Sequence, residues 1–460
     1  PINQFGTDFN SPNGSFQITG TQQLLNGTNY FWLTYDISPS AGIGNFVDAE
    51  CTQITMDGSG GTQTPVVTSP AGSRVIVSPL SGTVNVGTGE TYTTLTGSGG
   101  LFEAVNNLGL GANLVVNVTS NITEPGTFAL NQWSESGVGN YTLTIQPSSA
   151  SEKIISGNVA SIGMIRLDGA DRVIIDGRFG GSGKYLRFRN TSTAIAGITF
   201  LNDATYNTVT YCIIESGTTT AQVGGILFST TTGTLGNSNN IISYCDIRDR
   251  SDATAFPLCL IVSVGTPTAQ NSNNTIDNCN LFNCYANGNP AISVYLSTGS
   301  TAWTVSNNSI YQTATRTNTV TNSRLLPIYI TNSNGVNFNV SGNYIGGTAP
   351  LCGGTPLTYT SSTTGIYSYI QAISLVTIGT STASTIQNNI IRNITLTTIP
   401  PNGASVFPWI GINASTGSFN ITGNTIGSTT GNGAITINDN GIALTSTYGF
   451  YIDGMQVSPT

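Results

Sequence analysis

Histidine is missing from this 460-residue chain, and lysine occurs at only two positions, Lys153 and Lys184. Histidine is the side chain whose pKa best suits proton transfer near neutral pH, and it is also the commonest metal ligand. Charged residues make up 7% of the chain, against roughly 25% in an average soluble domain. The net charge of −8 and the pI near 4.4 argue against nucleic acid as a partner, because that interaction needs a basic surface.

Long apolar runs and close cysteine pairs are also missing. No uninterrupted apolar run of about 18 residues is present, so we expect no membrane-spanning segment. The seven cysteines, which run from Cys51 to Cys352, include no CxxC pair, and this argues against a zinc site and a dense disulfide framework. The chain begins at Pro1 without a signal peptide, and we expect a mature or trimmed chain whose export signal has been removed.

The chain is instead rich in short apolar bursts, such as FWLTYDI and RVIID, set among Gly, Asn, Ser and Thr. This texture is typical of many short β-strands joined by polar turns. One phrase recurs: an apolar residue, two further residues, then Cys, Asn or Asp, one residue, and usually Ile. Its instances are VIIDGR (173–178), VTYCII (209–214), ISYCDI (242–247), IDNCNL (276–281), VSNNSI (305–310), VSGNYI (340–345), IQNNII (386–391) and ITGNTI (421–426). The fourth position falls at Asp176, Cys212, Cys245, Cys279, Asn308, Asn343, Asn389 and Asn424.

A second phrase alternates with the first, for example GITF at 197, GILF at 225 and PIYI at 327. Two strand phrases per period, repeated along the chain, predict a solenoid. The first phrase recurs at intervals from 29 to 46 residues, and this irregular spacing favours an all-β, right-handed parallel β-helix, whose corners tolerate insertions. We expect the Gly/Thr/Pro-rich stretch 347–364 to be one such corner loop.

In a β-helix, each position stacks on its equivalent one rung away, at a distance of about 4.8 Å. We therefore predict apolar ladders of Ile and Val inside the rod. We also predict a structural ladder at one corner, made by the fourth-position residues, in which asparagine amides hydrogen-bond to one another. Cys212, Cys245 and Cys279 are expected to form a buried thiol ladder, and a disulfide between neighbours is the alternative.

Three regions follow along the chain. Residues 1–78 lack the repeat, and alternating segments at 30–37 and 46–56 predict a small β-sandwich-like module. Residues 79–112 are expected to be a linker and a capping helix, because Leu101, Ala104 and Val105 recur at helical spacing. This cap would cover the open edge of the first rung. The β-helix is predicted over 113–460 without a comparable cap before Thr460, which points to head-to-tail self-association into filaments.

Several phrases carry a resemblance to a known class of proteins. NYFWLTYDISPSAGIGNFVDAECTQITM resembles a module of large secreted surface proteins exported by the type IX route. GGLFEAVNN, LDGADRVIIDG and NNIISYCDI look like the β-helix regions that accompany this module. The resemblance covers nearly the whole chain and implies an extracellular or cell-surface location, with roles in adhesion, motility or matrix. It implies no catalytic residue.

One charged patch stands out, because nine of the thirteen basic residues fall between Lys153 and Arg250. Right-handed β-helices also include pectate lyases and polysaccharide hydrolases. These enzymes resemble one another in using clustered carboxylates, and the lyases add calcium and an Arg or Lys base. For such an enzyme, the candidate catalytic residues in this patch are Asp176, Glu215, Asp246 and Arg248. The structural interpretation is that Glu215 and Arg248, each three residues after a ladder cysteine, form an ion pair across adjacent rungs.

Aromatic residues offer a further possibility. The candidates for a carbohydrate platform, if several of them face outward, are Trp303, Tyr311, Tyr329, Tyr344, Tyr367 and Tyr369. Tyr295, Tyr329 and Tyr367 lie inside strand phrases, however, and stacking along a ladder is the commoner role of such residues. We expect an extracellular structural or adhesive surface rod, with no cofactor required and with surface glycans as possible partners. A polysaccharide lyase or hydrolase, with calcium as a possible ion, is the first alternative, and a non-catalytic glycan-binding module is the second.

Overall fold

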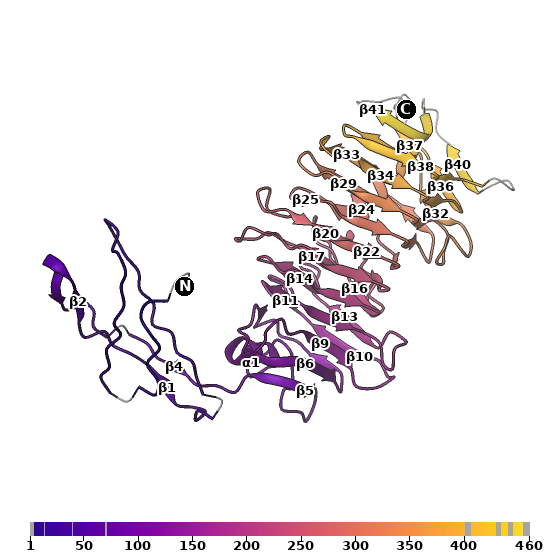
Figure 1. Cartoon of the computed structure of the whole chain (residues 1–460). Helices are drawn as coiled ribbons and strands as arrows, with labels where there is room; N and C mark the ends of the chain where they lie inside the picture. The colour runs from indigo at the N-terminus through magenta and orange to yellow at the C-terminus, as the bar shows by residue number, and fades with distance from the viewer. Residues whose placement is uncertain are drawn as a thin grey trace. The chain divides into compact units, whose positions relative to one another are not determined.

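A computed structural model of the chain describes residues 4–12, 14–38, 40–69, 71–400, 406–428, 434–439 and 445–453. The chain divides into two compact units, Pro1–Ser78 and Pro79–Thr460 (Figure 1). No helix among the described residues is long and apolar enough to cross a membrane. Residues 454–460, where we expected the rod to end without a cap, lie outside the described residues.

The first unit contains short antiparallel pairs. β1 (Phe46–Val47) pairs with β4 (Arg74–Val75), and β2 (Ile54–Met56) pairs with β3 (Gly61–Gln63) across a 3₁₀ turn at Gly58–Gly60. Residues 30–37, which we expected to form a strand, have no regular secondary structure. Tyr30 and Trp32 in this segment are each 77% exposed. Two facing sheets, as a sandwich requires, are not present in the described part of this unit, and its aromatic residues therefore lack a covering layer.

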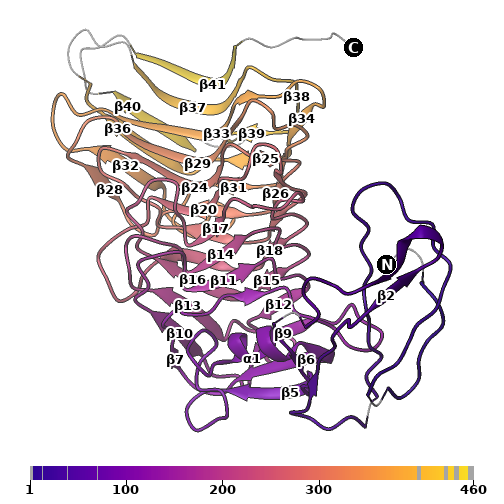
Figure 2. The same cartoon turned by 90° about the vertical axis from the view of Figure 1, so that its left-hand side faces the viewer.

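The second unit is a right-handed parallel β-helix, and the predicted fold class is thereby confirmed. From β6 onward, each rung contributes one strand to each of three long sheets, which the chain visits in the order sheet 1, sheet 2, sheet 3 (Figures 1 and 2). Sheet 1 contains β5 (Leu80–Val86), β6 (Leu110–Val118), β9 (Leu143–Pro147), β12 (Val173–Asp176), β15 (Thr208–Thr210), β18 (Ile241–Ser243), β22 (Thr275–Asp277), β26 (Thr304–Ser306), β30 (Asn339–Ser341), β34 (Ser384–Gln387) and β38 (Phe419–Thr422).

Sheets 2 and 3 complete each rung. Sheet 2 contains β7 (Ile122–Thr123), β10 (Lys153–Gly157), β13 (Leu186–Asn190), β16 (Cys212–Ser216), β19 (Asp246–Asp249), β23 (Asn280–Phe282), β27 (Ser309–Tyr311), β31 (Tyr344–Ile345), β35 (Ile390–Ile391) and β39 (Thr425–Ile426). Sheet 3 contains β8 (Leu130–Asn131), β11 (Ile165–Asp168), β14 (Ile198–Leu201), β17 (Ile226–Phe228), β20 (Cys259–Ser263), β24 (Pro290–Leu296), β29 (Ser323–Asn332), β33 (Ser368–Ile378), β37 (Val406–Ser415) and β41 (Thr445–Asp453).

The later rungs carry an additional parallel sheet, which the sequence did not predict. Sheet 4 contains β28 (Arg316–Asn318), β32 (Leu357–Ser361), β36 (Ile394–Thr398) and β40 (Ile435–Asp439). The stretch 347–364, expected to be a corner loop, contributes β32 to this sheet. A small pair, β21 (Asn271–Ser272) with β25 (Ser300–Thr301), lies at another corner. The insertions at the corners are therefore partly ordered into strands of their own.

The recurring phrase spans two strands and the single residue that turns the chain between them. In every instance except the first, the third residue of the phrase has a positive φ, for example 52° at Tyr211, 56° at Asn307 and 66° at Gly342. Asn and Gly adopt this left-handed conformation at a low energetic cost, so they favour a one-residue corner. The turn directs the following residue, the fourth of the phrase, into the rod, where Cys212 and Asn343 are both fully buried.

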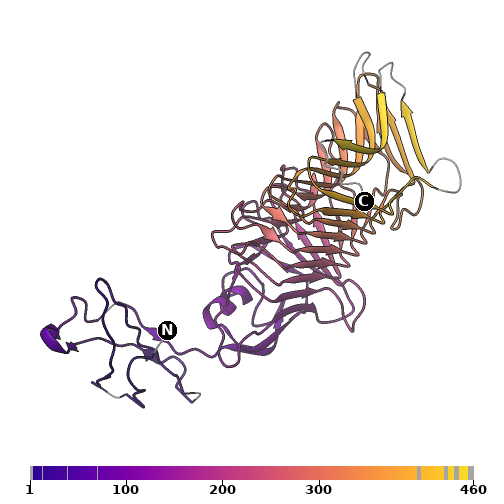
Figure 3. The same cartoon turned by 45° about the horizontal axis from the view of Figure 1, so that its top comes forward.

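The core is a stack of apolar side chains along the inside of the three long sheets. Ile175, Val209 and Ile242 follow one another on sheet 1, and all three are fully buried. On sheet 3, the rings of Phe200 and Phe228 stack with their centroids 4.4 Å apart. Each rung therefore buries its apolar side chains against the rungs on either side. Figure 3 shows the strands stacked along the length of this unit.

A helix lies at the N-terminal end of the rod. α1 (Leu101–Leu108) buries Leu101, Phe102 and Val105 and ends at Gly109, whose φ of 70° suits the residue after a helix. It packs against β5 and β8, the first strands of sheets 1 and 3. We expected 79–112 to be a linker followed by this cap. Leu80–Val86 instead forms β5, which pairs in parallel with β6, so the β-helix begins before the helix and not after it.

Candidate functional site

The charged patch lies on the outer face of sheet 2. Arg187 and Arg189 alternate with buried residues along β13, so both point outward. Strand register places Arg189 beside Glu215 on β16, and Glu215 beside Arg248 on β19. The three residues therefore form one column across three rungs. Insertions elsewhere in the rungs do not disturb this column, because the strands themselves stay in register.

Glu215 is the centre of this patch. Its side chain is fully buried, and its carboxylate meets Arg187 Nη1 at 3.2 Å, Arg189 Nε at 2.5 Å and Arg248 Nη2 at 2.8 Å. A buried carboxylate is tolerated only when cations and donors surround it, as they do here. The sequence indicated the pair of Glu215 with Arg248. It gave no sign that Arg187 and Arg189 approach the same carboxylate.

Further acidic groups balance the arginines around Glu215. Arg187 Nη2 lies 2.7 Å from Glu152 Oε2, and Arg189 Nη1 lies 3.4 Å from Asp252 Oδ2. Asp252 also pairs with Arg250, whose hydrogen bond is the main reason why the pKa of Asp252 is lowered. The patch is therefore a network in which opposite charges alternate, and not a cluster of one sign.

The remaining catalytic candidates are paired as well, but in separate places. Asp246 Oδ1 accepts hydrogen bonds from Lys184 Nζ at 2.6 Å and from Asn280 Nδ2 at 2.7 Å. Asp176 lies on sheet 1 and pairs with Arg178 at 2.6 Å. The structure therefore brings Glu215 and Arg248 into contact, whereas Asp176 and Asp246 each belong to a different ion pair.

The pKa of Asp249, unlike that of Asp252, is raised above its ordinary value. Burial is the largest influence and raises its pKa, while a hydrogen bond from Asn283 Nδ2 at 2.9 Å works against the rise.

Among the described residues, no group of three or more His, Cys, Asp or Glu is placed to hold a metal ion. The oxygen ligands that calcium prefers are instead engaged by Arg, Lys and Asn side chains.

The predicted corner ladder contains cysteine and asparagine in equivalent places. Asn308 Nδ2 donates to Asn343 Oδ1 at 3.0 Å, and Asn343 Nδ2 donates to Asn389 Oδ1 at 2.9 Å. Asn389 Nδ2 continues to Asn424 Oδ1 at 2.8 Å. Each of these amides also donates to a backbone carbonyl of the preceding rung, as from Asn343 to Val305 at 2.8 Å.

On the earlier rungs, thiols take the place of these amides. Cys245 Sγ lies 3.6 Å from the Val209 carbonyl, which is the equivalent acceptor. Cys212 and Cys279 make the corresponding contacts, and all three cysteines are free and buried. The backbone N–H of Cys279 donates to Asn308 Oδ1 at 2.9 Å, so the thiol and amide segments form one continuous ladder.

Asp176 does not belong to this ladder, contrary to our expectation. Its register partner is Thr210, and Leu186 occupies the place below Cys212. Nine residues, 177–185, separate Asp176 from Leu186, whereas Tyr211 alone separates Thr210 from Cys212, so the sheet 2 strand begins eight residues later than on the next rung. Asp176 consequently faces outward on sheet 1 and binds Arg178.

A second asparagine ladder was missed in the sequence. Asn207 Nδ2 donates to Asn240 Oδ1 at 3.0 Å, and Asn240 Nδ2 donates to Asn274 Oδ1 at 3.1 Å. These residues precede sheet 1 strands at spacings of 33 and 34 residues. The recurrence of Asn at this period was the available signal, but it lies outside the phrase that we aligned.

The aromatic candidates divide between the inside and the outside of the rod. Trp303 is fully buried and donates from Nε1 to the Asn271 carbonyl at 2.9 Å. Tyr295 and Tyr329 are partly exposed on sheet 3, with ring centroids 5.4 Å apart. These two tyrosines therefore stack on each other, as we expected along a ladder, and they also face outward.

Comparisons with known proteins bear on the fold alone. No family model matches the sequence, and no curated protein matches it. Among solved structures, the chain is similar to the Agl-KA catalytic domain, with 14% identity and a TM-score of 0.29 over 75% of this chain and 64% of that one. It is also similar to a family 28 exopolygalacturonase of Yersinia enterocolitica, with 12% identity and a TM-score of 0.25 over 90% of this chain and 58% of that one. The chain thus spans less than two thirds of either protein, and likeness at this level assigns it no activity.

Proposed function

We propose that this chain is an extracellular structural and adhesive rod and not a polysaccharide-cleaving enzyme. The observation that carries the proposal is the burial of Glu215 beneath three guanidinium groups. A general acid or base must reach its substrate and exchange a proton with it. A carboxylate that is fully buried beneath Arg187, Arg189 and Arg248 is closed to a substrate.

The other candidates support the same conclusion. Asp246 is held by Lys184 and Asn280, and Asp176 is held by Arg178. A glycosidase needs two carboxyl groups on opposite sides of one bond, about 5–9.5 Å apart, with one of them protonated. Carboxylates that are each committed to a separate cation do not meet this requirement.

The ladders suit a load-bearing rod. Each internal amide of the corner ladder bonds to the rung before it and to the rung after it, as Asn343 does with Asn308 and Asn389. Eleven strands of sheet 1 stack over a length of roughly 48 Å at the usual strand spacing. The resemblance to surface proteins of the type IX kind is the reason to place this rod outside the cell. Self-association into filaments belongs to the same proposal.

The test is depolymerisation of a broad panel of soluble polysaccharides by protein shown to be folded, with and without calcium. Reducing ends and product size are measured over time. We expect no shortening of any polymer in either condition. Cleavage that disappears in Glu215→Gln or Asp246→Asn variants would overturn the proposal and would assign catalysis to the charged patch.

A further inference from the structure

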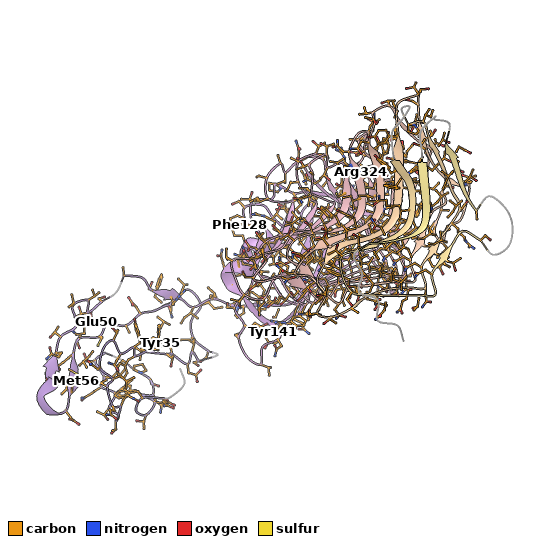
Figure 4. All side chains as sticks on the ribbon, turned by 90° about the horizontal axis from the view of Figure 1, so that it is seen from above. Tyr35, Glu50, Met56, Phe128, Tyr141 and Arg324 are labelled. Atoms are coloured by element: carbon orange, nitrogen blue, oxygen red, sulfur yellow. The ribbon has the colours of Figure 1, made fainter. Side chains whose placement is uncertain are left out.

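The corner between sheets 1 and 2 carries two tyrosines at positions where the following rungs carry asparagine or glycine. Side chains project outward along the second unit (Figure 4), and the third residue of the recurring phrase turns the chain at this corner. Asn278, Asn307 and Gly342 do so with φ values of 52°, 56° and 66°. Tyr211 and Tyr244 adopt the same left-handed conformation, with φ values of 52° and 54°.

This backbone conformation is unfavourable for tyrosine. A bulky residue at positive φ is an outlier, whereas asparagine and glycine adopt such a φ at low cost. Residues held in such conformations cluster at ligand-binding sites. The rings of Tyr211 and Tyr244 stack with their centroids 4.7 Å apart, and Arg178 Cζ lies 4.6 Å from the Tyr211 centroid. These contacts account for Tyr211, which lies against both Arg178 and Tyr244, but they use only one face of the Tyr244 ring.

The other face of the Tyr244 ring is accessible. Tyr244 is 41% exposed, and among the described residues Tyr211 is the one aromatic residue that its ring contacts. The equivalent residue on the next rung is Asn278, whose short side chain turns away and donates from Nδ2 to Asp277 Oδ2 at 2.6 Å. An exposed aromatic face therefore adjoins the polar side chains of the following rungs.

The polar groups on these rungs retain hydrogen-bonding capacity. Asp277 Oδ1 accepts hydrogen bonds from Ser306 Oγ at 2.6 Å and from Asn307 Nδ2 at 2.9 Å. Asn278 and Asn307 are exposed, and within the described part of the chain their amide oxygens accept no hydrogen bond. A carboxylate and two amides are thereby fixed in place beside Tyr244, with acceptors that face solvent.

We propose that Tyr244, Asp277, Asn278 and Asn307, which we call the corner site, bind a neutral sugar unit of a polysaccharide. The corner site would supply the adhesive contact of the proposed rod, and it rests on that proposed function. A sugar ring presents an apolar C–H face together with hydroxyl groups that donate and accept hydrogen bonds. The open face of the Tyr244 ring matches the apolar face, and the carboxylate and the two amides match the hydroxyl groups.

The charge of the corner site decides between a neutral and an acidic sugar. In the described part of the chain, the donors to the Asp277 carboxylate are all neutral, so no ion pair compensates its negative charge. Arg178, at the tyrosine end of the corner, is already bound to Asp176 at 2.6 Å. A uronic acid would bring a second carboxylate against Asp277, which is unfavourable. The three rungs of the site extend over roughly 10 Å, so it covers a short stretch of a polysaccharide.

The experiment is affinity electrophoresis of the full chain through gels that contain hydroxyethyl cellulose, xyloglucan, galactomannan or polygalacturonate. We expect retardation by at least one neutral polymer. Tyr244→Asn should weaken this binding by about tenfold through the loss of the aromatic contact. It should leave the melting temperature nearly unchanged, because asparagine suits the backbone conformation of this corner. Asn278→Gly, which also suits a positive φ, should weaken the binding as well. Tyr206→Asn is the matched control and should bind as the wild type does, because Tyr206 is 64% exposed and has a φ of 56° but lies at the opposite end of β15 from this corner.

The outcomes separate the corner site from the proposed function. Retardation by none of the neutral polymers, retardation by polygalacturonate alone, or equal loss in the Tyr206→Asn control would overturn the site. A Tyr244→Asn protein that is retarded like the wild type but no longer assembles with concentration would also overturn it, and would assign the ring to contacts between copies of the chain. Cleavage of a retarded polymer would overturn the proposed function and leave the site in place.

Discussion

Replacing Asn343 measures what one rung of the corner ladder contributes to stability. Asn343 is fully buried. Its Nδ2 donates to the Val305 carbonyl and to Asn389 Oδ1, and its Oδ1 accepts from the backbone N–H and Nδ2 of Asn308. Asn343→Ala removes all four hydrogen bonds. At about 0.5–1.5 kcal/mol each, their loss should lower the free energy of unfolding by about 2–6 kcal/mol.

The chain itself supplies a graded variant. Cys245 occupies the equivalent corner and donates from Sγ to Val209. Asn343→Cys should therefore keep the contact with Val305, lose the acceptor for Asn308, and recover about 1 kcal/mol relative to alanine. The expected order of stability is wild type, then Asn343→Cys, then Asn343→Ala.

Denaturant unfolding and hydrogen exchange give independent measurements. Because neighbouring rungs of a repeat protein unfold partly on their own, exchange should rise first at the Asn308 amide, whose acceptor has been removed. Asn334→Ala, at an exposed asparagine, is the control and should leave both measurements unchanged. An Asn343→Ala protein with the midpoint of the control and a protected Asn308 amide would refute the reasoning.

Four further predictions concern other groups. Glu215→Gln leaves three arginines without their shared carboxylate and should lower the free energy of unfolding by about 3–5 kcal/mol. Asp252→Asn, at the more exposed rim of the patch, should lower it by less than about 1 kcal/mol. Equal effects would contradict the central role of Glu215. Burial alone would raise the pKa of Asp203, but hydrogen bonds from Thr231 and the backbone of residues 234–236 outweigh it and lower that pKa. The stabilisation by Asp203 is therefore present above the ordinary value of about 3.9 and is lost as pH falls through the lower folded value, so the difference in melting temperature between wild type and Asp203→Asn should shrink in acid; a constant difference from pH 6 to pH 2 would count against this. Thiol titration should find Cys51 reactive in the native protein and the six buried cysteines reactive only in denaturant, and fewer than seven thiols in denaturant would reveal a disulfide. Light scattering should show assemblies that grow with concentration, and a monodisperse monomer at high concentration would contradict self-association.

The sequence alone determined the repeating part of this protein. A phrase that returns about every 34 residues must place its equivalent residues on top of one another in a coil. The buried positions of Cys212, Asn343 and their counterparts follow from this, as does the contact of Glu215 with Arg248. The prediction was wrong at Asp176, because the inserted segment 177–185 lies between this residue and the sheet 2 strand. The phrase around Asp176 resembles the others in sequence, but its fourth residue does not occupy the ladder position.

The tertiary structure decided what depends on several rungs at once. Arg187 and Arg189 approach Glu215 through a register set across an insertion, and neither spacing nor composition encodes that register. The fourth sheet arises where corner insertions from separate rungs pair with one another, as β32 does with β36. Tyr295 and Tyr329 on sheet 3 likewise stack only because strands of different length stay in register. Periodicity fixes which residues point inward, whereas the outer surface depends on insertions that follow no period.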